Sequence, residues 1–207
     1  MEKIDILSYP IYKFVCDDQL LQDVQEHVKT LEFKSSQDNS DIFGDYVHDK
    51  LYEFFNDSVT QVKNKYYKKT VDFPIVACWA NKYNTVQNMR SHTHSNGIIS
   101  GLFYVSTHEK SSPTIFSMPD PWTNFYDTPY KMLSFYDNSA SVTASVYPKA
   151  GTLLLFPSNM VHSVQATGSK ETRYTISFNC FPSGTFFPYV TMALEVKALT
   201  VQERIKA

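Results

Sequence analysis

The chain has 207 residues, 43% hydrophobic and 19% charged, a composition typical of a globular protein with a core of its own. Its formal net charge of −2 argues against nucleic acid as a partner, and no apolar run reaches the length of a membrane span. The three widely spaced cysteines, Cys16, Cys78 and Cys180, form no C-x-x-C pair, which favours reduced thiols and a cytoplasmic location.

The N-terminal third predicts one or two edge strands and two amphipathic helices. The strand pattern is rich in β-branched and aromatic residues, and the helices show apolar residues at helical spacing. In chain order we expect strands between Ile4 and Val15 interrupted by Pro10, a helix over 18–32 with Asp17 or Asp18 as its N-cap, a loop over 35–44, and a helix over 49–68.

Beyond Asp72 the pattern changes to strands. We expect them over 75–79, 98–105, 113–118, 141–146, 152–156, 161–165, 172–180 and 189–197, with a short tail over 199–206. The aromatic-rich segment 119–140 lacks periodicity, and a loop of this length in a compact domain is usually functional, often a lid. We therefore predict one domain over 1–207, mainly β with flanking helices, in which a helical support region over 1–70 packs on a β core over 71–197.

Three histidines are the candidate metal ligands. His92 and His94 stand one residue apart before an apolar run, and in a strand such residues project to the same face. His162 follows a strand that ends at Pro157, so it can point inward from the rim of a barrel. Three protein ligands on one side of a metal leave other positions open for substrate and oxygen, as in non-haem iron oxygenases.

A candidate anion site follows His162. Arg173 begins a strand in which it shares one face with Thr175 and other polar residues, an arrangement that suits a pocket holding a carboxylate. Asn81 and Tyr83 lie two residues apart at the predicted end of an earlier strand, and both side chains can donate hydrogen bonds to a small acid.

These motifs together resemble the Fe(II)- and 2-oxoglutarate-dependent oxygenases, and within them a subfamily common in tailed phages and marine bacteria and related to prolyl hydroxylases. The resemblance covers about residues 75–180. It rests on His92-x-His94, Ser100-Gly101-x-x-Tyr104-Val105, the segment from Phe116 to Asp120-Pro121, the block from Gly151 to His162, and Arg173-x-x-x-Ser177-Phe178-Asn179. It implies a double-stranded β-helix, or jelly roll, with two N-terminal helices packed on one sheet.

The resemblance also implies roles for single residues. His92 and His162 would bind iron, and Arg173 would pair with the distal carboxylate of 2-oxoglutarate. Asn81 and Tyr83 match an Asn-x-Tyr pair with which some relatives hold this co-substrate, and Thr175 could assist Arg173. Candidates for the substrate region are Asp120, Trp122 and Tyr104.

One residue departs from the superfamily pattern. The second iron ligand of these enzymes is normally a carboxylate, and His94 stands in its place. We expect His94 to bind the metal, and two alternatives stay open: Asp120 supplies the ligand instead, or only two residues hold the iron.

The functional hypothesis is therefore an Fe(II)- and 2-oxoglutarate-dependent dioxygenase that hydroxylates a C–H bond and releases succinate and CO2. The expected partner is a small-molecule or peptide substrate, with a prolyl residue as the first candidate. A phage-encoded protein would act in the host cytoplasm, and a homodimer stays open.

Two alternatives remain. The run Gly151-x5-Pro157 before His162 approximates a cupin motif, so a three-histidine dioxygenase that does not use 2-oxoglutarate is one of them. The departure at His94 favours the other, a non-catalytic β-sandwich that serves as a binding or virion-associated module.

Overall fold

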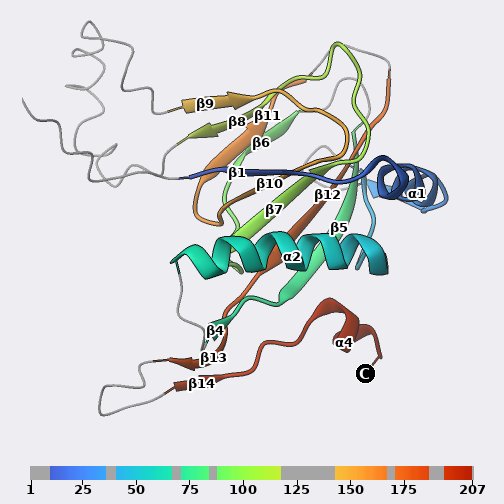
Figure 1. Ribbon diagram of the computed structural model, residues 1–207. Helices are drawn as coiled ribbons and strands as arrows, with labels where there is room; N and C mark the ends of the chain where they lie inside the picture. The colour runs from blue at the N-terminus through green and yellow to red at the C-terminus, as the bar shows by residue number, and fades with distance from the viewer. Residues whose placement is uncertain are drawn as a thin grey trace, which may run out of the picture.

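The structure is a computed structural model, and it describes residues 10–35, 41–66, 71–83, 88–117, 143–166, 171–186 and 194–206. Three antiparallel sheets and three helices make up these residues (Figure 1). The prediction of a mainly β fold is thereby confirmed. Within the described ranges, no helix is long and apolar enough to cross a membrane.

The largest sheet has seven strands in the order β1-β10-β7-β12-β5-β3-β2. These are β1 (Tyr12–Val15), β10 (Thr152–Pro157), β7 (Ile99–Tyr104), β12 (Arg173–Cys180), β5 (Ile75–Tyr83), β3 (Asp41–Ile42) and β2 (Lys34–Ser35). The central strands β10, β7 and β12 are almost wholly buried; β10 and β7 read as near-continuous runs of apolar or small residues, whereas β12 alternates polar and apolar residues.

A four-stranded sheet, in the order β6-β11-β8-β9, forms a second layer. Its strands are β6 (Met89–His92), β11 (Val161–Val164), β8 (Thr114–Ser117) and β9 (Thr143–Val146). A third small sheet comprises β14 (Leu194–Val196), β13 (Ser183–Phe186) and β4 (Val71–Asp72), and helix α4 (Val201–Lys206) follows it.

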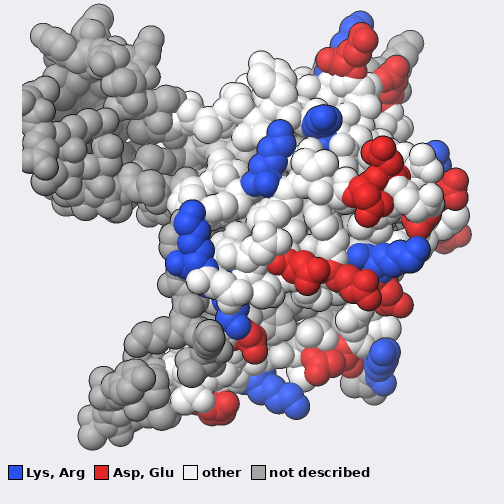
Figure 2. Space-filling view, in the orientation of Figure 1, with Lys and Arg blue, Asp and Glu red and all other residues white. Residues whose placement is uncertain are grey.

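Helices α1 (Asp18–Lys29) and α2 (Asp49–Tyr66) contribute to the larger hydrophobic core together with the seven-stranded sheet. Phe55 of α2 carries much of this contact, because its ring lies 4.5 Å from that of Phe178 and 5.7 Å from that of Phe103. Figure 1 shows α2 lying across the strands of this sheet, and Figure 2 shows acidic and basic side chains interspersed over the same face.

A glycine makes room for one of these rings. Gly101 in β7 is the register partner of Phe178 in β12, and a Cβ atom at residue 101 would lie 2.2 Å from the Phe178 ring. Since no side chain tolerates such a distance, the ring packs over bare backbone. This close packing explains the Ser-Gly sequence at the centre of β7.

The N-terminal elements are close to those predicted. Asp17 is the N-cap of α1, since its carboxylate accepts a 2.8 Å hydrogen bond from the Leu20 amide. The helix ends at Lys29, three residues earlier than predicted, because the amide and the hydroxyl of Thr30 both bond to the His27 carbonyl. The predicted loop over 35–44 contains the short strand β3, which pairs with β5.

Two predictions near the histidines were wrong. His92 is the last residue of a separate short strand, β6, and His94 lies outside any strand, in the connection to β7. The strand β5 continues through Asn81 to Tyr83, because its pairing with β12 extends to Arg173. The segment 119–140, with Asp120 and Trp122, lies outside the described residues.

Candidate functional site

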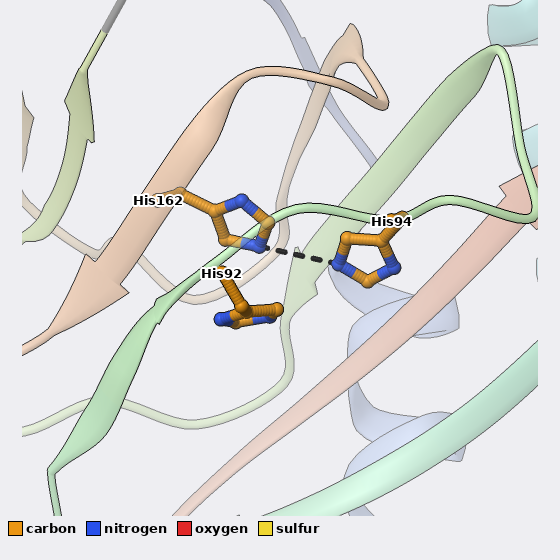
Figure 3. Close-up of side chains that lie close together, drawn as sticks. All are labelled: His92, His94 and His162. Atoms are coloured by element: carbon orange, nitrogen blue, oxygen red, sulfur yellow. Dashed lines mark hydrogen bonds between the residues drawn. The ribbon is translucent and has the colours of Figure 1, made fainter. Parts of the chain in front are cut away.

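Three histidines from different parts of the chain converge between the two larger sheets (Figure 3). His92 of β6 and His162 of β11 are direct register partners, so both side chains leave the same face of their sheet. His94 reaches them from the connection that follows β6. One ring nitrogen of each histidine lies within 4.8 Å of those of the other two, with no carboxylate in the group among the residues described.

Backbone carbonyls set the orientation of two of these rings. Nδ1 of His92 donates to the carbonyl of Arg90 at 2.8 Å, and Nδ1 of His162 donates to that of Met160 at 3.0 Å. When Nδ1 carries the proton, Nε2 keeps its lone pair and can bind a metal. In each case the acceptor is two residues upstream of its histidine.

The third ring completes the cluster. Nε2 of His94 lies 3.2 Å from Nε2 of His162, and their rings are stacked with centroids 5.0 Å apart. Since the His162 Nε2 is left as an acceptor, the His94 Nε2–H donates to it. Metal binding through both Nε2 atoms would require the other neutral tautomer of His94, with its proton on Nδ1.

Burial keeps His94 and His162 neutral. Desolvation lowers the pKa of His94 to about 4 and that of His162 to about 3, and the neighbouring His92 acts in the same direction. The apolar surroundings include Trp79, whose ring stacks 5.7 Å from that of His94, and Phe156, whose ring lies 5.0 Å from that of His162. Neutral imidazole is the form that binds metal, so the site needs to release no proton from an imidazolium at neutral pH.

A small pocket, open to solvent, extends from the histidines along the seven-stranded sheet. It is lined by Trp79, Asn81 and Tyr83 of β5 and by Ser177 of β12. In these two strands the facing pairs are Trp79–Ser177, Asn81–Thr175 and Tyr83–Arg173. Because alternate residues of a strand share a face, these six side chains project to the same side. The pocket therefore has the histidines at one end, and Arg173 lies beyond the other.

Arg173 is a buried cation without an acidic partner among the described residues. Its guanidinium lies 4.7 Å from the ring centroid of Tyr83, and one terminal nitrogen donates to the Ser112 carbonyl at 3.1 Å. Burial lowers its pKa, against the effect of Tyr83 and Tyr104. Within the described part of the chain, its Nε–H has no hydrogen-bond acceptor. Such an orphaned, buried charge fits an anionic ligand.

Between these ends, the Asn81 amide lies against two hydroxyls. Its Nδ2 is 3.3 Å from Thr175 Oγ1 and 3.1 Å from Ser177 Oγ, and its Oδ1 is buried without a donor. Rotating the amide by 180° exchanges the two atoms. Both hydroxyls then donate to Oδ1, and Nδ2 becomes a free donor. That orientation removes the unpaired acceptor and suits a carboxylate ligand.

The structure thus brings together seven residues singled out in the sequence: His92, His94, His162, Arg173, Asn81, Tyr83 and Thr175. It places Tyr104 differently from the sequence prediction. Tyr104 is fully buried, its hydroxyl lies 2.7 Å from that of Thr114, and it lies near Arg173, whose positive charge acts against the rise in the tyrosine's pKa that burial causes. Tyr104 therefore belongs to the arginine end and not to a substrate opening, while Asp120 and Trp122 lie outside the described residues.

Sequence reasoning missed Trp79 as a pocket residue, although Trp79 shares the strand alternation of Asn81 and Tyr83. Ser177 was predicted on the polar face of Arg173 and Thr175, and it does line the pocket.

Comparisons with known proteins now give the site a context. Residues 77–179 match the model of a protein family described as "Putative 2OG-Fe(II) oxygenase". No curated protein was found to match the chain.

Several solved structures share the fold. HygX from Streptomyces hygroscopicus, crystallised with nickel and 2-oxoglutarate, is 9% identical, with a TM-score of 0.61 over 94% of each chain. A prolyl-4-hydroxylase from Pseudomonas putida is 14% identical, with a TM-score of 0.58 over 83% of this chain and 93% of that one. The viral collagen prolyl hydroxylase of Paramecium Bursaria Chlorella virus-1 is 12% identical, with a TM-score of 0.53 over 82% and 94%. At these identities the similarity establishes the fold alone.

Proposed function

The chain belongs to the Fe(II)- and 2-oxoglutarate-dependent oxygenases, and from this membership we propose that it is a dioxygenase that hydroxylates a C–H bond of its substrate. One observation carries the proposal. Three converging imidazoles lie at one end of a pocket, and an orphaned, buried arginine lies beyond its other end, on the face of β5 and β12 that lines the pocket. This arrangement accommodates a metal and, at a distance, an anion.

In this proposal His92, His94 and His162 hold Fe(II) through their Nε2 atoms. Three neutral imidazoles suit Fe(II), as they suit Ni(II) and Zn(II), and they occupy one side of the ion. The oxygen chemistry itself comes from the bound iron, with 2-oxoglutarate converted to succinate and CO2. The protein supplies neutral ligands, fixed ring orientations and walls that exclude water.

The co-substrate 2-oxoglutarate would lie along the facing pairs of β5 and β12. Arg173 would bind its distal carboxylate, with Tyr83 supporting the guanidinium and Tyr104 beside it. Asn81, in the rotated orientation held by Thr175 and Ser177, would donate to the bound anion. Each of these groups is a donor or a cation, so each favours a dianion over a neutral ligand.

A small-molecule or peptide substrate remains part of the proposal, with a prolyl side chain as the first candidate because two structural neighbours are named prolyl hydroxylases. Another neighbour with this fold, SnoN, is named an epimerase. A test of the function should therefore not depend on one chosen substrate.

The test measures succinate formed from 2-oxoglutarate by the Fe(II)-loaded protein without added substrate. We expect the formation of succinate under these conditions to depend on oxygen. Replacement of Arg173 by Ala should lower the rate at least about 100-fold at low 2-oxoglutarate, because the buried charge pairs with the carboxylate. Arg204→Ala, which removes an exposed arginine of α4, is the matched control and should keep the wild-type rate.

Two other outcomes would reassign the protein. Metal binding without any binding or turnover of 2-oxoglutarate would favour the cupin-type three-histidine dioxygenase, which the histidine at residue 94 already suggests. Failure of the wild-type protein to bind any divalent metal would favour the non-catalytic module.

A further inference from the structure

We propose that a buried hydrogen-bond network of Ser100, Ser158 and Asn179 positions His94 for metal binding. The inference rests on the proposed metal site and concerns only one of its three ligands. Among them, His94 is the one that no strand holds, because it lies in the connection 93–98 between β6 and β7. Its place therefore depends on whatever fixes that connection.

The connection is fastened to the turn after β10 at both ends. The His94 amide donates to the Ser158 carbonyl at 2.8 Å, and the Ser158 amide donates to the Ile98 carbonyl at 3.0 Å. A single residue, Ser158, thus binds the backbone on either side of the loop. The position of Ser158 sets the position of His94.

The side chain of Ser158 is in turn part of the network. Ser100 Oγ lies 2.8 Å from Ser158 Oγ and donates to Asn179 Oδ1 at 2.7 Å. Since the Ser100 proton is used on Asn179, the Ser158 hydroxyl must be the donor to Ser100. All three residues are 1% exposed, so water does not compete for these bonds.

The network also contacts the tip of the connection. Asn179 Nδ2 donates to Asn96 Oδ1 at 2.9 Å. Gly97 lies against the same groups, because a Cβ atom there would be 2.9 Å from Ser158 Oγ and 3.1 Å from Asn179 Cβ. The loop therefore rests on the network along its length, and a larger residue at position 97 would displace it.

His92 and His162 have no comparable dependence. They lie in paired strands and face each other in register, and their rings are oriented by carbonyls of their own strands or turn. A defect in the network should thus act on the metal through His94 and leave the other two ligands in place. An effect of the network on His94 alone can therefore be distinguished by experiment from a general effect on the fold.

The first experiment measures nickel affinity by calorimetry in a double-mutant cycle. Nickel binds imidazole more tightly than iron does, so a site with two histidines remains measurable. Ser100→Ala and Asn179→Ala should each weaken nickel binding about 10-fold in the wild-type background. The same changes should have less than about a 2-fold effect when His94 is already Ala. The matched control is Ser58→Ala, which removes an equally buried serine hydroxyl from α2.

A second readout needs no metal. In the metal-free protein, hydrogen exchange at the His94 amide should accelerate at least about 10-fold in Asn179→Ala, because its bond to Ser158 opens more often. Gly97→Ala keeps every polar group and should give the same acceleration by displacing the loop. It serves as the alternative probe if the polar variants do not fold.

The outcomes separate the two proposals. Wild-type protein that binds no nickel would overturn the proposed metal site, and this inference with it. Nickel binding by the wild type together with unchanged affinity in both network variants would overturn the inference alone. An equal loss of affinity with and without His94 would do the same, because it would show that the network supports the fold generally.

Discussion

The two ends of the candidate site differ in charge. Burial keeps His94 and His162 neutral, whereas Arg173 stays charged in a buried place with no acidic side chain beside it in the described ranges. Asn81 lies between them and faces both hydroxyls of β12. Its neutrality matters, because a carboxylate in its place would offer Arg173 an internal partner.

Asn81→Asp should therefore block the co-substrate and spare the metal. The new carboxylate would still accept from Thr175 and Ser177, but it would repel a dianion and compete for Arg173. We expect 2-oxoglutarate binding to nickel-loaded protein to weaken more than about 100-fold by calorimetry, with nickel affinity within about 2-fold of wild type. Asn81→Ala removes only hydrogen bonds and should lose about 10-fold. Equal losses in the two variants would contradict the role of charge.

At the scale of elements, helix α2 depends on a histidine. His48 is its N-cap: Nδ1 accepts a hydrogen bond from the Leu51 amide at 3.4 Å, and its carbonyl accepts from Tyr52. Burial lowers the pKa of His48, and the nearby His27 adds to this, whereas Asp23 and Asp49 act in the opposite direction. A protonated ring would have no lone pair for the Leu51 amide.

The pH dependence follows from this shift. The folded protein binds the proton at His48 more weakly than the unfolded chain, so the stabilisation is present above pH 6.5 and is lost as the pH falls below it. His48→Asn keeps an acceptor that does not titrate. In urea unfolding at pH 7.5 and 5.5, its free energy of unfolding should fall less than that of the wild type. His48→Ala should lower the free energy of unfolding by about 1 kcal/mol already at pH 7.5. If the free energy of unfolding of His48→Asn falls with pH as steeply as that of the wild type, the role of the His48 cap is refuted.

Elements were predictable where the local sequence determines them. The strands β7, β10 and β12 are strongly apolar or strictly alternating, so their positions were found to within about two residues. Strand β6, with the sequence Met89-Arg90-Ser91-His92, is half exposed and has no such pattern. Its extended form comes from pairing with β11, some 70 residues later, and such pairing leaves no local signal.

The candidate site likewise has features that the sequence predicts and features that it does not. The alternation of the strand predicted that Arg173 and Thr175 share one face, and the order of the motifs along the chain identified the three histidines as metal ligands. The support of His94 could not be predicted, because Ser100 meets its partners Ser158 and Asn179 across 58 and 79 residues. The local sequence around a serine or an asparagine in a strand does not indicate a hydrogen-bond partner so far along the chain.

At the scale of the whole molecule, the described residues form two hydrophobic clusters with different roles. The larger lies between the helices and the seven-stranded sheet, and it includes Phe55 with its contacts to Phe103 and Phe178. The smaller lies between the two larger sheets and includes Phe156, whose ring touches that of His162. The first cluster holds the layers together, and we infer that the second also shapes the metal site.

Matched substitutions in the two clusters should separate stability from metal binding. Phe55→Leu and Phe156→Leu each replace a buried ring with a smaller apolar side chain, and each should lower the free energy of unfolding by about 1 kcal/mol. Only Phe156→Leu removes the ring that lies 5.0 Å from His162, so only it should weaken nickel binding, by about 10-fold. Calorimetry on folded protein gives the affinity, and urea unfolding without metal gives the stability. Equal loss of nickel affinity in both variants would contradict this prediction. It would show that a change in the core between the helices and the seven-stranded sheet also affects the histidines.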